Sequence, residues 1–272
     1  MITRALLVVG LAGAVTTVAA DDSFPWEHDF ETARAIAQAT GRPIMIDFWA
    51  TWCGPCKIMN AKTFPDPRVI EKSAAVVPLK QDVDNEGKQL AERYGITAYP
   101  TILFIDAEGK VQDKIIGAVP AGPFAEKLDG VSYNELVQAK MVLRKAPDNG
   151  EANARIAAAY AMRGEFESAA AAMDKARAAG YQGGYLARAN LNAGDYHLRR
   201  GKLDEALSAF RKADHPRYDD AIRAYAKLRM LELYQRQKDA SRAERTAKSL
   251  LRLKDAPEPF LRRAREVLKE SE

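Results

Sequence analysis

Cys53 and Cys56 are the only cysteines in the 272 residues, and they lie three positions apart. A pair at this spacing can close a small disulfide within one helical turn, and the disulfide opens again when another thiolate attacks it. The pair follows the short apolar run 43–49, which predicts a buried strand. Cys53 is therefore expected where a strand gives way to a helix, and the pattern predicts a redox-active dithiol.

The two cysteines are expected to have different roles. The pKa of an ordinary cysteine is about 8.5, and the unpaired amides at a helix N-terminus favour the thiolate and can lower that pKa to about 7. Cys53 is expected to project from the helix start as the nucleophile, whereas Cys56, one turn inside, is shielded and resolves the mixed disulfide. Pro55 suits an early helical position that needs no backbone donor, and Gly54 leaves the backbone open to a substrate.

An acidic residue lies inside the apolar strand that precedes the cysteines. Burial of Asp47 there would raise its pKa, and the carboxylate could then accept the proton of Cys56 as that thiol attacks. Lys80, in the next segment with a strand pattern, is the expected charge partner of Asp47. The alternative is that Asp47 starts a turn and that Lys80 is a surface residue of its strand.

The first 20 residues have the pattern of a signal peptide. Arg4 precedes an apolar stretch of about fourteen residues, which is shorter than the roughly 20 needed to span a bilayer. Cleavage is expected after Ala20, although an uncleaved anchor is the alternative. The protein is therefore expected to be periplasmic or secreted, in an oxidising compartment.

Charge divides the chain into two parts. Residues 21–132 contain 12 Lys and Arg against 17 Asp and Glu, a net charge of −5, whereas residues 133–272 contain 28 against 20, a net charge of +8. The basic residues of the second part alternate with acids along helical faces, which is typical of a solvated surface and argues against nucleic-acid binding. His28, His197 and His215 show no ligand spacing, so neither a metal nor another cofactor is expected.

The two parts also differ in their patterns of secondary structure. Residues 21–131 alternate helix and strand signals, which predicts an α/β domain with a central mixed sheet flanked by helices. A possible capping box at 132–135 opens a predicted connecting helix, and the breaker-rich turn 146–150 ends this linker. Residues 151–272 are predicted to be all-α.

The all-α part repeats with a period of 37 residues. The residues that align in this register are Gly164, Gly201 and Lys238; Ala169, Ala206 and Ala243; Tyr160, His197 and Tyr234; and Met173, Phe210 and Ala247. Helix-turn-helix units of this length resemble tetratricopeptide repeats, whose usual period is about 34. The resemblance implies a surface that binds a protein partner, and a plain helical bundle is the alternative.

Residues scattered over the α/β part agree with one known active site. They are Asp47, Trp52, Cys53, Gly54, Pro55, Cys56, Lys57, Lys80, Tyr99, Pro100, Thr101 and Gly117. Their order and spacing closely resemble those of the thioredoxins over roughly residues 28–130. The resemblance implies the thioredoxin fold, a buried acid with its lysine, a cis peptide bond before Pro100, and attack by Cys53. It also implies that the backbone of 99–101 binds an extended substrate as an added strand.

Substrate contacts are expected around the dithiol, at Trp52, Gly54, Pro55, Tyr99 and Thr101. The segment 63–67 resembles the periplasmic thiol-disulfide interchange branch of the family, whereas Tyr99 replaces the commoner aliphatic residue before the proline. The substrates are then thiols and disulfides of other proteins.

A reductase is favoured over an oxidase because no histidine lies between the cysteines to stabilise the thiolate further. In an oxidising compartment, a reductase would require a membrane-derived electron donor. Two alternatives remain: a redox-linked holdase chaperone, because the domain order resembles that of the chaperedoxins, which lack an export signal, and a disulfide isomerase.

Overall fold

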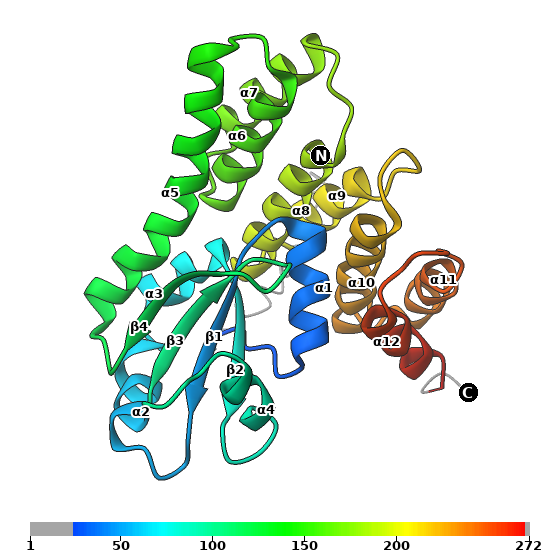
Figure 1. Cartoon of the computed structure of the whole chain (residues 1–272). Coiled ribbons are helices and arrows are strands. Elements are labelled where there is room, and N and C mark those ends of the chain that lie inside the picture. Colours follow the sequence, from blue (N-terminus) through cyan, green and yellow to red (C-terminus); the bar gives the residue numbers. More distant parts are fainter. Residues whose placement is uncertain (1–23, 270–272) are drawn as a thin grey trace, which may run out of the picture.

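The computed structural model describes residues 24–269 (Figure 1). The predicted signal peptide and its cleavage site after Ala20 lie outside the described residues. Within the described part of the chain, no helix combines the length and the apolar character needed to cross a membrane.

A four-stranded mixed sheet forms the centre of the first half. Its strands are β1 (Ile44–Trp49), β2 (Val77–Asp82), β3 (Thr101–Ile105) and β4 (Val111–Ile116), in the order β2-β1-β3-β4. β1 pairs with β2 in parallel, and the other two pairs are antiparallel. The predicted mixed sheet is confirmed. The side chains of β3 are all buried and those of β4 are mostly exposed, as expected for a central and an edge strand.

Helices cover both faces of this sheet, as the alternation of side chains along a strand requires. Ile44 and Ile46 pack on one face with α1 (Phe30–Thr40) and α4 (Lys88–Arg93). Met45 packs on the other face with α3 (Pro67–Lys72) and the first part of α5 (Ala121–Lys145). The short α2 (Gly54–Ile58) follows β1 and continues into a π-helical turn, η1 (Met59–Thr63), and the 3-10 turn η2 (Ser73–Ala75) follows α3.

The helix start predicted at 132–135 is wrong. α5 is one helix from Ala121 to Lys145, so it crosses position 132 without interruption. Ser132 does not cap a helix start, because its hydroxyl donates a hydrogen bond to the backbone oxygen of Asp129, one turn earlier in the same helix. A short polar side chain can satisfy itself in this way inside a helix, so its pattern alone does not mark a terminus.

The second half is all-helical, as predicted. After α5 come α6 (Gly150–Met162), α7 (Phe166–Ala178), α8 (Gly184–Arg199), α9 (Leu203–Ala213), α10 (Asp220–Arg236), α11 (Ala240–Leu250) and α12 (Glu258–Lys269). Gly164, Gly201 and Lys238 lie in the turns between paired helices, and all three have positive φ, of 75°, 68° and 57°. The 37-residue period therefore corresponds to a repeated left-handed turn, which Lys238 adopts without being glycine.

The two halves pack against each other through α1 and three helices of the second half. α1 contacts α8, α10 and α12 (Figure 1). The guanidinium of Arg42, between α1 and β1, lies 2.7 Å from the carboxylate of Asp195 on α8, and both side chains are buried. Arg42 precedes β1 and Cys53 follows it, so this contact and the cysteines lie at opposite ends of the strand.

Candidate active site

Cys53 and Cys56 form a disulfide at the start of α2. Cys53 is the N-cap residue of this helix, and its sulfur accepts a hydrogen bond from the backbone amide of Cys56 at 3.2 Å. This places the sulfur of Cys53 at the positive end of a run of amides, where a thiolate is stabilised.

The sequence predicted an exposed Cys53 and a shielded Cys56, but the two side chains are almost equally buried. Cys53 is 3% exposed and Cys56 is 2% exposed, so the first cysteine does not project from the helix in this oxidised state. Their positions in the helix still differ, since Cys53 caps the free end and Cys56 lies inside the turn. A substrate must therefore reach Cys53 at a nearly closed surface.

The acid and the lysine lie opposite each other on neighbouring strands. Asp47 of β1 is in register with Lys80 of β2, and the Lys80 Nζ lies 3.6 Å from the Asp47 Oδ2. Asp47 is 2% exposed, and its other oxygen, Oδ1, is buried without a hydrogen-bond partner. Burial raises the pKa of Asp47 to about 6, although the positive charge of Lys80 lowers it. Neither residue lies in a turn.

Because the pKa of Asp47 is raised, the stability of the protein should depend on pH. Between about pH 4 and pH 6 the native state holds a proton at Asp47 that the unfolded state has lost, so ionisation of this group weakens folding as the pH rises and has no further effect above about 6. The free energy of unfolding of Asp47→Asn, relative to that of wild type, should therefore increase by on the order of 2 kcal/mol from pH 4 to pH 8. Urea denaturation of both proteins at these two pH values measures this, and an equal difference at both would contradict it.

Asn60 and Trp26 contact Lys80 and were not predicted from the sequence. The Lys80 Nζ donates a hydrogen bond to the side-chain oxygen of Asn60 in η1, and it lies 4.9 Å from the centroid of the Trp26 ring and 5.0 Å from that of Trp49. One signal for Asn60 was available. It lies four residues after Cys56, so a continuous helix would place both on one face.

The segment before β3 has the backbone that the resemblance implied. The peptide bond between Tyr99 and Pro100 is cis, and the Pro100 oxygen accepts a hydrogen bond from the amide of Gly117 at 2.8 Å. Thr101 is buried, and its hydroxyl donates to the backbone oxygen of Ala98, so any contact of Thr101 with a substrate would have to come from the backbone.

Trp52 joins the cysteine turn to two other segments. Its ring lies edge-to-face with that of Tyr99, at 5.8 Å between centroids, and its indole nitrogen donates to a carboxylate oxygen of Asp84 at 2.8 Å. Trp52 is 64% exposed, so this bracing holds a large aromatic ring at the surface. Gly54 and Pro55 are exposed beside it, and a side chain added at Gly54 would meet open space. Asp84 was not predicted.

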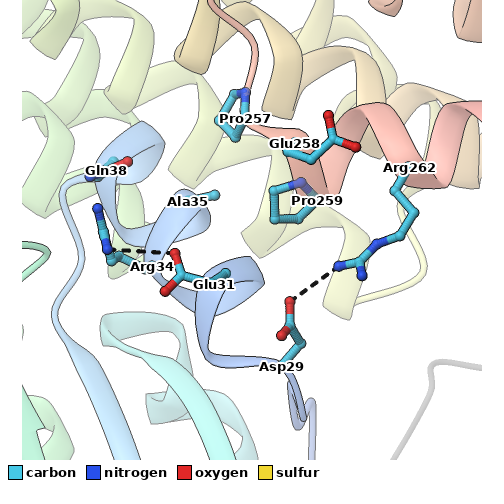
Figure 2. Close-up of a pocket in the computed structure, with 9 residues that line it drawn as sticks. All are labelled: Asp29, Glu31, Arg34, Ala35, Gln38, Pro257, Glu258, Pro259 and Arg262. Atoms are coloured by element: carbon cyan, nitrogen blue, oxygen red, sulfur yellow. Dashed lines mark hydrogen bonds and ion pairs between the residues drawn. The ribbon is translucent and has the colours of Figure 1, made fainter.

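Two other kinds of site can be compared with the cysteine pair. No group of three metal-ligating side chains occurs within residues 24–269. A hollow of about 440 Å³ lies between α1 and the start of α12, where Asp29 faces Arg262 across it and Glu31 pairs with Arg34 on α1 (Figure 2). None of the residues around this hollow belongs to the cysteine site.

Comparison with known proteins identifies the first half. The profile of the thioredoxin-like domain matches residues 30–132. The thiol:disulfide interchange protein DsbD of Salmonella typhi is 38% identical over 103 residues, which are 36% of this chain and 18% of the relative. The H-type thioredoxin of Oryza sativa subsp. indica is 41% identical over 92 residues, which are 34% of this chain and 71% of the relative.

Solved structures give similar matches. A thioredoxin from Thermus thermophilus is 32% identical, with a TM-score of 0.37, and the match covers 40% of this chain and 87% of that one. The oxidised C-terminal domain of DsbD from Neisseria meningitidis is 26% identical, with a TM-score of 0.32, over 37% of this chain and 90% of that one. The chain spans less than a fifth of the length of the DsbD proteins that it matches. Through residues 30–132, the chain belongs to the thioredoxin family of thiol-disulfide oxidoreductases.

Proposed function

We propose that the protein reduces disulfides of other proteins through Cys53 and Cys56. The thiolate of Cys53 attacks a substrate disulfide, which forms a mixed disulfide and releases one substrate sulfur as a thiolate. Cys56 then attacks the Cys53 sulfur, which releases the second substrate sulfur and leaves the disulfide between Cys53 and Cys56. Two electrons pass to the substrate. The observation that carries this proposal is the sulfur of Cys53 at the N-cap of α2.

Asp47 is the proposed acceptor of the Cys56 proton during the second attack. A pKa of about 6 lets the carboxyl be ionised at neutral pH and yet remain basic enough to take a proton. Its buried Oδ1 has no hydrogen-bond partner among residues 24–269, so an oxygen is free for this role. Lys80 supplies a positive charge that keeps the ionised form accessible.

The substrate is proposed to lie across Trp52 and Tyr99 as an extended segment. The exposed ring of Trp52 offers an apolar contact, and Gly54 and Pro55 add little bulk beside it. The backbone around Pro100 supplies the hydrogen bonds of an added strand, with Thr101 contributing through its main chain alone.

The direction of electron flow is tested by the equilibrium potential of the cysteine pair against glutathione. The reduction potential of thioredoxin is about −270 mV and that of the strong periplasmic oxidant DsbA is about −120 mV. This difference is set largely by how well the thiolate is stabilised. Only Gly54 and Pro55 separate the cysteines, so we expect a value below about −220 mV. A value above about −150 mV would assign the protein to oxidation instead.

We propose that the protein works in the periplasm or outside the cell, where a membrane-derived dithiol donor returns electrons to the disulfide. The pattern of residues 1–20 and the similarity to DsbD support this location. The division proposed from the sequence places the thioredoxin-like domain at 21–131, a connecting helix and linker at 132–150 and the helical repeats at 151–272. α5 runs from the first of these into the connecting segment.

The helical half is proposed to bind a protein partner or client. Its regular pairs build an extended surface of the kind that repeat proteins use for binding. α1 contacts α8, α10 and α12, so a partner must bind elsewhere on the helical half or beside α1. Binding that survives in the Cys53→Ser variant would support this role.

A further inference from the structure

Lys80 has two polar neighbours that compete for its ammonium group. The Nζ donates to the side-chain oxygen of Asn60, whereas the Asp47 Oδ2 lies 3.6 Å away, beyond the distance of a good hydrogen bond. The side chain of Lys80 is 13% exposed, so water has little access to it. The neutral amide therefore takes the direct hydrogen bond, and the carboxylate does not.

Three aromatic rings lie close to the Lys80 ammonium. The Lys80 Nζ lies 4.9 Å from the centroid of Trp26, 5.0 Å from that of Trp49 and 5.4 Å from that of Phe64. Each ring attracts a cation by its negative face, and the attraction is stronger where water is excluded. These contacts offset part of the cost of burying the charge without a carboxylate in direct contact.

The geometry points to Asn60 as a positioning residue that keeps the Lys80 ammonium from closing onto Asp47. The inference rests on the proposed role of Asp47 as proton acceptor. A lysine in direct contact would stabilise the carboxylate and make it a weaker base, because the Coulomb attraction rises as the separation falls. Burial has the largest effect on the pKa of both groups, and within residues 24–269 the only charge that shifts the pKa of Asp47 is that of Lys80, so the distance between them also affects the basicity of Asp47.

The test follows the Asp47 carboxyl by ¹³C NMR titration in the full-length oxidised protein. In Asn60→Leu the ammonium loses its acceptor and should move onto Asp47, so the pKa of Asp47 should fall by about one unit. Because general-base catalysis weakens as the pKa of the base falls, the attack by Cys56 should then slow at pH 8, by less than about tenfold for a shift of one unit. In Asn60→Asp the added negative charge should raise the pKa of Asp47 instead.

Opposite shifts in the two variants support the inference, and an unchanged or raised pKa in Asn60→Leu overturns it. Asn60→Gln keeps the acceptor and should restore most of the wild-type value. If the leucine variant does not fold, Asn60→Ala removes the same acceptor and should lower the pKa of Asp47 in the same way. Asn190→Leu, a half-buried amide on α8, is the matched control and should leave the titration unchanged. If Asp47→Asn does not slow the attack by Cys56, the proposal that Asp47 accepts the proton fails. The titration of Asp47 in the Asn60 variants still tests the role of Asn60 in that case.

Discussion

Cys53→Ser should reduce the rate of disulfide reduction by at least about a thousandfold, because a serine hydroxyl is not ionised at neutral pH and cannot attack a disulfide. The oxygen at the helix start would still accept the amide hydrogen bond of Cys56, so the fold should be retained. Reduction of a protein disulfide, followed with a dithiol donor in excess, measures the loss. Residual reduction above about one tenth of the wild-type rate would contradict the assigned nucleophile.

Cys56→Ser provides the matched comparison. Cys53 can still attack in this variant, but the mixed disulfide has no second thiol to resolve it, so substrates should accumulate as covalent adducts detectable by mass spectrometry. Adducts on Cys56 in the Cys53→Ser protein would reverse the two roles. Suppression of client aggregation by the Cys53→Ser protein would support the holdase alternative, whereas loss of every activity in that variant would favour redox chemistry alone.

Asp195→Ala should lower the free energy of unfolding by about 3 to 5 kcal/mol, because it leaves buried positive charges without their partner. Asp195 accepts hydrogen bonds from Arg42 at 2.7 Å, from Tyr225 at 2.9 Å and from Arg229 at 3.1 Å. Burial alone would raise the pKa of Asp195, yet the charges of Arg42 and Arg229 hold it below the ordinary value. Urea denaturation at pH 7 measures the change.

An exposed ion pair provides the control for this prediction. Asp174 lies 3.0 Å from Arg177 on α7, and its side chain is 77% exposed. Asp174→Ala should change the free energy of unfolding by no more than about 0.5 kcal/mol. If Asp195→Ala and Asp174→Ala had similar small effects, the contact between the two halves would not contribute to stability in the way its burial indicates.

The fold of the first half could be predicted from the sequence, because its signals are local. The short apolar run 43–49 places β1, and the N-cap position of Cys53 follows from the strand that precedes it. The cis bond before Pro100 came only from the family resemblance, since nothing in the local sequence requires it. The burial of Cys53 was missed because exposure depends on segments distant in the sequence.

The contacts between the halves could not be predicted. Arg42 and Asp195 are separated by 153 positions, and neither lies in a motif. Their pairing depends on how α1 packs on α8 and α10, which no local pattern determines. The spacing of Asn60 from Cys56 was visible in the sequence, but its hydrogen bond with Lys80, which lies on a strand 20 positions further along, was not.

The docking of α1 on α8, α10 and α12 has a consequence for access to the dithiol. Arg42 and Cys53 lie at opposite ends of β1, so the helices that pack on α1 lie away from α2 (Figure 1). The helices α8, α10 and α12 therefore do not stand over the cysteine turn. Steric selection at the dithiol itself should depend on the shape of the incoming protein, whereas the helical half can influence only those clients that are large enough to reach both regions.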